Sequence, residues 1–247
     1  MMPGYDGVPC AELAARLRSP GLLCLEEVGS TLDIVHELAA EGAPTGTVVL
    51  AESQQRGRGR QGRPWHSPPG VGIWLGYLVR MRRAPATGVL ALRVGMAVAG
   101  VLRTLGAGVR LKWPNDVLLE DRKLAGVLCE ARETRGNRWV AVGIGMNVHG
   151  PLPANLERSA VALEEWLPHV RRVSVLERLL PALQRLDPAP ELTPGECARF
   201  AELDWLRGRT VAEPLRGTAC GVAPDGALLV QTGQGTLRIT GGSVRAA

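Results

Sequence analysis

The stretch VRLKWPNDVLLEDRKLAGVLCEA, residues 109–131, contains three short runs of β-forming residues in close succession. The polar turn at 120–122 joins the second run to the third, and a fourth run follows a turn at 133–137. We therefore expect four strands, at residues 109–113, 116–119, 124–131 and 139–144. Strands joined by short turns pair in antiparallel order, so the sequence predicts an antiparallel meander here.

Helices and strands are also expected before this meander. Ser30 is a favoured helix N-cap, Asp33 follows three positions on, and apolar residues keep helical spacing until Gly42. Residues 86–105 predict a long, mostly apolar and buried helix. The other expected segments are a helix at 10–18, strands at 22–27, 47–51 and 73–79, and a loop at 54–70.

The sequence after the meander changes character twice. Residues 151–207 predict helices, with breaks at four prolines, Pro168, Pro181, Pro188 and Pro194. Beyond residue 209, Gly and Asp-Gly turns separate four short strands, at residues 210–212, 218–222, 227–231 and 236–239. Four short strands in so little chain predict a small β-barrel appended at the C-terminus.

Composition excludes several classes of protein. The chain has 247 residues and is 45% hydrophobic, which is enough for a full core. The longest apolar stretch, 84–109, is interrupted by Arg93 and Arg103, so no membrane span is expected. The N-terminus lacks the pattern of a signal peptide, and the five cysteines are odd in number and widely spaced. These features favour a cytoplasmic protein and argue against a zinc ribbon.

The basic residues are distributed in an informative way. Of 29 lysines and arginines only two are lysines, Lys112 and Lys123, and they lie eleven positions apart in one predicted hairpin. Lysine is a compact point charge and arginine a planar fork, so the two are not equivalent at a binding site. An ordinary solvated hairpin is the plain alternative, but the clustering favours a site. The net charge of +5 allows an anionic partner.

The loop QQRGRGRQGRPW, residues 54–65, is the most unusual stretch of the chain. Gly57, Gly59 and Gly62 spell GxGxxG, but no helix can open in the proline-rich residues that follow, so a dinucleotide fingerprint is rejected. Glycines let a backbone approach a ligand, and arginines donate to carboxylates and phosphates. The loop is either a lid over a small anionic ligand or a patch for single-stranded nucleic acid with Trp65 stacking on a base.

Three motifs, taken in this order, resemble those of biotin protein ligases. They are RGRGRQGRPWHSP (56–68), KWPNDVLLEDRKLAG (112–126) and VGIGMNV (142–148). The resemblance runs from about residue 28 to 148 and continues more weakly to the C-terminus. It implies an α+β fold with an SH2-like catalytic domain, 1–206, whose mixed and largely antiparallel sheet has flanking helices. It also implies a small SH3-like β-barrel, 207–247.

The resemblance implies a two-step reaction as well. Biotin and MgATP would give biotinyl-5′-adenylate, and a lysine of a biotin carboxyl carrier protein would then take the biotinyl group. Arginine and lysine side chains can screen the repulsion between the biotin carboxylate and the α-phosphate. No protein-bound metal site is visible, so Mg²⁺ is expected to arrive with the ATP phosphates.

Site residues are carried over from the resemblance position by position. For biotin they are Ser30, Thr31, Leu32, Gln54, Arg58, Gly59, Arg60 and Lys123. For ATP they are Arg58, Arg60, Trp65, Lys112, Asn115, Asn147 and Arg245. Within these sets Ser30, Thr31 and Gln54 would meet the ureido head group, and Trp65 the adenine. The expected catalytic residues are Lys123, Arg60 and Asp116, with Asp116 the candidate to orient or deprotonate the acceptor lysine.

Two departures from the family pattern stand out. Leu32 occupies a position where the family often has Asn or Gln, so it is expected to form pocket wall or contribute backbone only. A separate DNA-binding domain is also missing, which implies a monofunctional ligase with no DNA partner. A homodimer is left open. His36, His149 and His169 are expected at the surface or its boundary.

Two other functions compete with this interpretation. A lipoate or octanoate ligase of the same fold would have a long apolar tunnel in place of a short pocket with converging polar groups. A basic protein that binds single-stranded nucleic acid through the 56–63 loop would show salt-sensitive binding and no ATP turnover.

Overall fold

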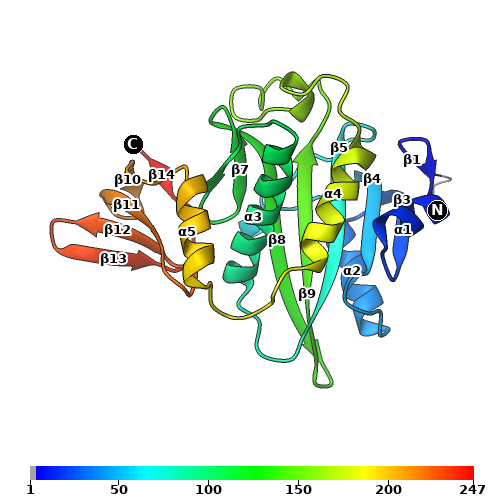
Figure 1. Ribbon diagram of the computed structural model, residues 1–247, viewed down its shortest axis with the longest axis horizontal. Helices are drawn as coiled ribbons and strands as arrows, with labels where there is room; N and C mark the ends of the chain where they lie inside the picture. Colours follow the sequence, from blue (N-terminus) through cyan, green and yellow to red (C-terminus); the bar gives the residue numbers. More distant parts are fainter. Residues whose placement is uncertain (1–3) are drawn as a thin grey trace.

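The computed structural model describes residues 4–247, which form three sheets with helices packed around them (Figure 1). In chain order the elements are β1 (Gly4–Tyr5), β2 (Val8–Pro9), α1 (Cys10–Leu17), β3 (Leu22–Val28), α2 (Thr31–Ala40), β4 (Val48–Gln54), η1 (Arg60–Gly62), β5 (Gly72–Met81), α3 (Thr87–Thr104), β6 (Arg110–Lys112), β7 (Asp116–Leu119), β8 (Arg122–Thr134), β9 (Asn137–Asn147), η2 (Leu163–Glu165), α4 (Arg172–Gln184), α5 (Pro194–Leu203), β10 (Thr210–Glu213), β11 (Gly217–Val222), β12 (Leu228–Thr232), β13 (Gly235–Ile239) and β14 (Arg245–Ala246).

The large sheet carries the site. Within the described residues it has seven strands in the order β3-β4-β5-β9-β8-β7-β6. The pair β3 and β4 is parallel, and every other neighbouring pair is antiparallel. The four strands expected over 109–144 are β6 to β9, so the meander is confirmed. The expected α+β class with a mixed, largely antiparallel sheet is confirmed with it.

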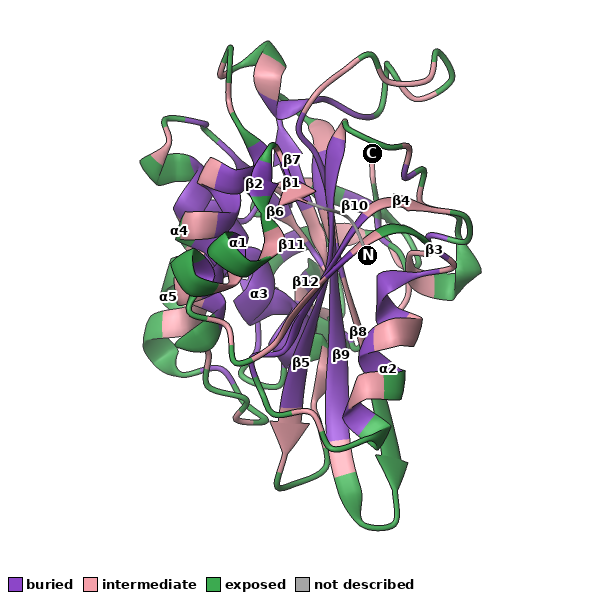
Figure 2. Cartoon of the chain, turned by 90° about the vertical axis from the view of Figure 1, so that its right-hand side faces the viewer, coloured by how far each residue is buried: buried purple, intermediate pink, exposed green. Residues whose placement is uncertain are grey.

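Helices cover both faces of this sheet (Figure 2). In β4, Val48 and Leu50 join the core under α3, whereas Val49 packs with the apolar face of α2. This alternation follows from the two-residue period of a strand. Ser30 caps α2, because its Oγ accepts a hydrogen bond from the backbone N–H of Leu32, as the sequence predicted.

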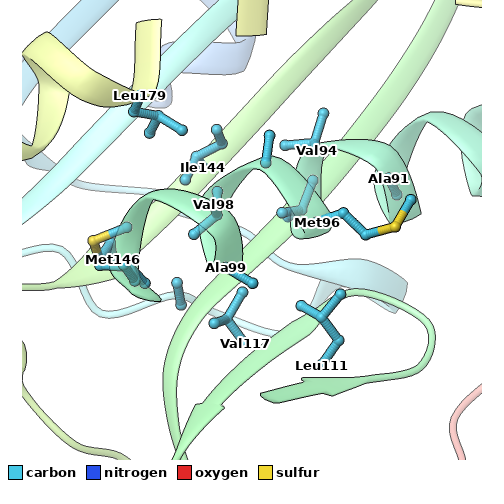
Figure 3. Close-up of a cluster of buried hydrophobic side chains, with 14 of the residues drawn as sticks. Ala91, Val94, Met96, Val98, Ala99, Leu111, Val117, Ile144, Met146 and Leu179 are labelled. Atoms are coloured by element: carbon cyan, nitrogen blue, oxygen red, sulfur yellow. The ribbon is translucent and has the colours of Figure 1, made fainter. Parts of the chain in front are cut away.

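The long apolar helix α3 lies inside the larger core. Figure 3 shows Val94 and Val98 of α3 in one buried cluster with Ile144 of β9 and Leu179 of α4. Among residues 4–247, α3 is the helix that is long and apolar enough to cross a membrane, but 61% of that window is buried inside the protein. Its apolar surface is therefore accounted for by core packing.

Arg93 lies in the middle of this buried helix and is only 2% exposed. Its guanidinium donates hydrogen bonds to Glu196 on α5 and to the backbone carbonyl oxygens of Ala189 and Glu191. A buried charge is tolerated when it is paired and hydrogen-bonded in this way. The same bonds fasten α5 to the core.

The expected helical region 151–207 is only partly helical. Residues 151–162 form turns and extended chain instead, and Lys123 of β8 exchanges backbone hydrogen bonds with Ser159 and Val161. Pairing with a strand therefore replaces helix formation in this segment.

Of the four prolines expected at helix breaks, Pro168 and Pro188 lie between helices as predicted, whereas Pro181 does not. Pro181 lies inside α4 and does not break it, because Leu179, Leu180 and Leu183 are buried around it and their packing outweighs the lost backbone bond. Pro194 begins α5 at the first helical position, after the N-cap Thr193.

A five-stranded antiparallel sheet, in the order β13-β12-β11-β10-β14, forms the C-terminal module. The four strands expected here are β10 to β13, and β14 was not expected. This arrangement confirms the SH3-like expectation. Trp113 anchors the module to the large sheet, because its Nε1–H donates to the carbonyl oxygen of Gly226 at 2.9 Å.

Candidate active site

A pocket of about 370 Å³ lies over the large sheet, between the N-terminus of α2, the loop 57–68 and the start of β8. This volume is typical of a site for a small molecule. The pocket is also lined by the β6–β7 turn, the segment 151–160 and Ser243 and Val244 of the C-terminal module. Its wall includes these residues expected from the sequence, namely Ser30, Thr31, Leu32, Gln54, Arg58, Gly59, Arg60, Trp65, Lys112, Asn115, Asp116, Lys123 and Asn147.

One end of the pocket carries amide and hydroxyl groups. Gln54, at the end of β4, accepts hydrogen bonds through Oε1 from the backbone N–H of Thr31 at 2.9 Å and from its hydroxyl at 3.2 Å. Its Nε2 donates to the hydroxyl of Ser67 at 2.9 Å. Ser30 and Thr31 are buried. These groups suit a neutral, polar ligand head, which needs short-range hydrogen bonds in place of a counter-charge.

Leu32 is a wall residue, as expected from its apolar side chain. It is 3% exposed and packs against Gly143 on β9. A Cβ at Gly143 would lie 3.1 Å from the Leu32 side chain, so this strand needs a glycine for α2 to approach.

Another part of the pocket wall carries an ion pair. Strand register places Lys112, Asp116 and Gly126 opposite one another on β6, β7 and β8. Lys123 Nζ lies 2.6 Å from Asp116 Oδ1, and both side chains are partly exposed to the pocket. Two of the three expected catalytic residues therefore meet directly, which residue spacing alone did not show.

Trp65 lies on a floor made of two glycines. A Cβ at Gly145 would lie 2.5 Å from the indole, and one at Gly126 would lie 3.1 Å from it. Lys123 Nζ lies 5.0 Å from the ring centroid, within the range of a cation–π contact. The indole Nε1 is buried without a hydrogen-bond partner in the described chain. An aromatic surface and an unpaired donor thus lie together at the wall of the pocket.

Arg58 is held by two carboxylates. Its Nε and Nη2 donate to Glu130 of β8, both at 2.8 Å, and Nη2 also donates to Asp33 of α2 at 2.9 Å. The hydrogen bonds from Arg58, with a smaller contribution from His36, lower the pKa of Glu130 to about 2. Glu130 in turn raises the pKa of Arg58.

Arg60 is the contrasting cation of the same loop. It lines the pocket but forms no ion pair or side-chain hydrogen bond with residues 4–247. Burial lowers the pKa of its guanidinium, and the nearby Asp116 carboxylate opposes that shift. An unpaired, half-buried guanidinium is a binding group for a carboxylate or a phosphate.

The polar residues near the ion pair have structural partners. Asn115 Nδ2 donates to the carbonyl oxygen of Val127 at 2.8 Å, and Asn147 Nδ2 donates to those of Lys123 and Val161, both at 3.4 Å. Lys112 Nζ lies 5.3 Å from the ring centroid of Trp205. These side chains therefore brace the strands that carry Lys123 and Asp116.

Arg245 is the expected site residue that the structure does not bring to the pocket. Its side chain is 75% exposed and lies 3.6 Å from Glu213, whereas the pocket wall includes its neighbours Ser243 and Val244. Its position on the exposed strand β14 directs it to solvent and to the carboxylate of β10.

Several residues near the site were missed from the sequence. His36 is 2% exposed, so its expected surface position is wrong; it lies between α2 and the sheet, bonded to Trp139 and Glu130. Glu130 and Asp33 pair with Arg58 over long sequence separations that no local pattern reveals. Within residues 4–247 no group of three or more His, Cys, Asp or Glu side chains is arranged to hold a metal ion.

Comparison with protein families gives two matches along the chain. Residues 26–147 match the biotin/lipoate A/B protein ligase family, and residues 207–245 match the biotin protein ligase C-terminal domain. The first range contains the meander and the loop 54–65, called the glycine–arginine loop below, and the second contains the small antiparallel sheet.

Individual relatives are similar over most of the chain. A bifunctional ligase/repressor from Bacillus subtilis is 32% identical over 238 residues, which cover 88% of this chain and 71% of the relative. A biotin–[acetyl-CoA-carboxylase] ligase from Mycobacterium tuberculosis is 33% identical over 233 residues, covering 88% and 86%. The structure of a biotin protein ligase from Aquifex aeolicus in complex with biotin and ATP aligns with a TM-score of 0.76 and 27% identity, covering 92% of this chain and 100% of that one.

The mixed sheet, its cation-lined pocket and the C-terminal β-module define a ligand-binding α+β protein whose site combines neutral polar groups with cations. The chain belongs to the biotin/lipoate A/B protein ligase family, and the C-terminal match places it with the biotin protein ligases.

Proposed function

We propose that this chain joins biotin to ATP, forming biotinyl-5′-adenylate and pyrophosphate, and then transfers the biotinyl group to a lysine of a biotin carboxyl carrier protein. The observation that carries the proposal is the pocket itself, whose wall brings together Lys123, the unpaired Arg60 and the polar groups of Ser30, Thr31 and Gln54. Residues 1–206 form the catalytic domain in this proposal and residues 207–247 the SH3-like domain.

The first step requires two anions to meet. The biotin carboxylate attacks the α-phosphorus of ATP, a P–O bond forms, and the bond to pyrophosphate breaks. Lys123 holds the carboxylate, and Arg60 faces the charge that develops on the α-phosphate oxygens. One such donor is worth about 3 kcal/mol in a closed site. Arg58, with its orientation fixed by Glu130, adds a second guanidinium at the same wall.

The neutral polar groups of the pocket would select the ligand. The ureido head group is neutral and both donates and accepts hydrogen bonds, which matches the hydroxyls of Ser30 and Thr31 and the amide of Gln54. The Leu32 side chain forms an apolar wall nearby. This arrangement favours biotin over lipoate, whose dithiolane ring offers no such partners.

The nucleotide would use the aromatic surface of Trp65 and the polar residues around the ion pair. Stacking on an indole is favourable for any base, including adenine. Lys112, Asn115 and Asn147 line the same region, and Mg²⁺ would enter with the ATP phosphates.

In the second step the acceptor lysine must arrive as a neutral amine. Its nitrogen attacks the carbonyl carbon of the adenylate, an amide forms, and AMP leaves with the electrons of the anhydride bond. Asp116, whose carboxylate lies 2.6 Å from Lys123 Nζ, is our candidate to orient that amine or to take the proton that it loses as the amide forms.

The carrier has a free sheet edge on which to dock. Beyond Val127, whose backbone bonds to Asn115, β8 pairs with β9 on one side, and its other side has no strand partner within residues 4–247. Such an edge can pair with an added strand. This edge lies on the strand that carries both Lys123 and Glu130.

The test is incubation of the chain with biotin, MgATP and a carrier domain, followed by mass spectrometry of the carrier. One biotinyl group on one lysine, dependent on both small molecules, supports the proposal. Modification by lipoate in preference to biotin would favour the sister activity. Salt-sensitive binding to single-stranded oligonucleotides without biotin-dependent pyrophosphate release would favour the nucleic-acid alternative.

A further inference from the structure

A chain of hydrogen bonds runs from the buried core to the glycine–arginine loop. Trp139 Nε1 donates to His36 Nδ1 at 2.9 Å, and His36 Nε2 lies 3.2 Å from Glu130 Oε2. Glu130 holds Arg58 through two bonds of 2.8 Å. The chain crosses from β9 to α2, then to β8, and ends on the loop.

The hydrogen bond from Trp139 fixes the tautomer of His36. An indole Nε1–H can only donate, so His36 Nδ1 must accept and its proton must be on Nε2. His36 Nε2–H therefore donates to Glu130. Because His36 is 2% exposed and held from both sides, the direction of this hydrogen bond is set by the core.

The last link leaves part of Arg58 available. Nε and Nη2 are engaged by Glu130 and Asp33, whereas Nη1 makes no hydrogen bond to residues 4–247. Arg58 lines the pocket, and Gly57 and Gly59 on either side of it offer no side chains to orient it. Its orientation must therefore come from the carboxylates.

We propose that His36 is a positioning residue: through Glu130 it fixes the guanidinium of Arg58, so that the loop presents an ordered cation to the anionic part of the ligand. This inference rests on the proposed function. The alternative is a parked state, in which Glu130 holds Arg58 away from the ligand. In that state, removal of the Glu130 carboxylate would strengthen biotin binding. A cation that is ordered before binding loses less side-chain freedom when the ligand arrives.

Two substitutions separate the two bonds of His36. In His36→Asn the amide oxygen can replace Nδ1 and accept from Trp139, but the side chain is too short to reach Glu130. In His36→Gln the longer amide can replace Nε2 and donate to Glu130. Loss of one hydrogen bond to a charged group corresponds to a change of about tenfold in affinity. We expect His36→Asn to raise the biotin KM and Kd about tenfold with a smaller change in kcat, and His36→Gln to restore most of the affinity.

Amide hydrogen exchange of the ligand-free protein gives a readout that needs no activity. The amides of residues 57–62 should exchange faster in His36→Asn than in the wild type, with unchanged exchange in α3. Glu133→Gln is the matched control, because Glu133 is on the same strand and pairs with Arg138 at 2.7 Å, exposed to solvent. It should change neither the exchange nor the biotin KM.

Each outcome decides the matter. If His36→Asn folds poorly, Glu130→Gln tests the same link from the strand side, and tighter biotin binding in that variant would establish the parked state and overturn the proposal. Equal biotin KM and equal loop exchange in the wild type and in His36→Asn would also overturn it. A wild type that binds no biotin would contradict the proposed function, while the exchange comparison would still report on the positioning.

Discussion

Lys123 Nζ lies 2.6 Å from Asp116 Oδ1. The protein therefore supplies its own carboxylate to the ammonium that we expect to bind the carboxylate of biotin. The ion pair with Asp116 holds the Lys123 ammonium at the pocket wall before the ligand arrives. When biotin binds, the ammonium has donors for both carboxylates, since it carries three N–H groups.

Replacement of Lys123 tests this arrangement. Lys123→Ala removes the cation and leaves Asp116 as an unpaired negative charge facing the incoming carboxylate. We expect biotin affinity and the rate of adenylate formation to fall at least about 100-fold, since one charge-assisted donor is worth about 3 kcal/mol. Single-turnover kinetics and calorimetric titration with biotin measure the two effects.

Arg122→Ala is the control for that variant, because the neighbouring cation pairs with Glu165 at 2.9 Å outside the pocket wall. It should keep wild-type rates. A Lys123→Ala protein that forms the adenylate as fast as the wild type would remove Lys123 from the site.

Replacement of Arg60 tests whether the loop protects the intermediate. The adenylate is a mixed anhydride, so water must be kept from it until the carrier arrives. Because Arg60 has no partner in the described chain, we expect it to pair with the adenylate phosphate, and Arg60→Ala should release or hydrolyse the adenylate about tenfold or more faster. Quenched-flow measurement of adenylate loss in the absence of carrier gives the rate. Arg56→Ala, an exposed residue of the same loop, should retain the intermediate, and equal retention in Arg60→Ala would show that Arg60 does not close the site.

A methyl group at Gly145 tests the floor under Trp65. The added Cβ would lie 2.5 Å from the indole, so the ring must move away from β9. We expect Gly145→Ala to raise the KM for ATP about tenfold, because a displaced ring loses a stacking contact worth about 1–3 kcal/mol. Gly108→Ala adds a methyl group where nothing lies within 4 Å and should leave that KM unchanged. An equal KM for ATP in the wild type, Gly145→Ala and Gly108→Ala would show that Trp65 does not take part in nucleotide binding.

Acid titration of stability tests the Arg58–Glu130 pair. The pKa of Glu130 is lowered from 4.5 to about 2, chiefly by the hydrogen bonds from Arg58. A carboxylate with a lowered pKa in the folded state stabilises the protein above its unfolded pKa, and this contribution is lost as the pH falls from about 4.5 to 2. Glu130→Gln should therefore cost about 2 kcal/mol of unfolding free energy at pH 7, and the difference from the wild type should shrink below pH 4.5. Urea unfolding at several pH values measures it, and a difference independent of pH would contradict the assigned cause.

The sequence was informative where a local pattern carries the structure. The strands of the 109–144 meander follow from alternation and short turns, and Ser30 is the N-cap that its position predicted. The site residues that meet in the pocket come from five separate segments of the chain. The family resemblance grouped these segments into one site, whereas their spacing in the sequence could not.

The remaining features depend on contacts that lie far apart in the chain. Residues 151–162 have the composition of a helical region but bond to the backbone of Lys123, which no local rule anticipates. His36 has the helical position of a boundary residue, yet its helix packs on the sheet and buries it against Trp139. Glu130 reaches Arg58 across 72 positions, and Arg245 points to Glu213 because of the β10–β14 pairing.

The central claim is that one pocket brings the carboxylate of biotin to the α-phosphate of ATP. Exchange of labelled pyrophosphate into ATP, measured without any carrier protein, tests it most directly. The account predicts that label enters ATP only when biotin is present, that lipoate does not replace biotin, and that Lys123→Ala slows the exchange at least about 100-fold. Exchange that proceeds without biotin, or no exchange with biotin and MgATP together, would contradict it.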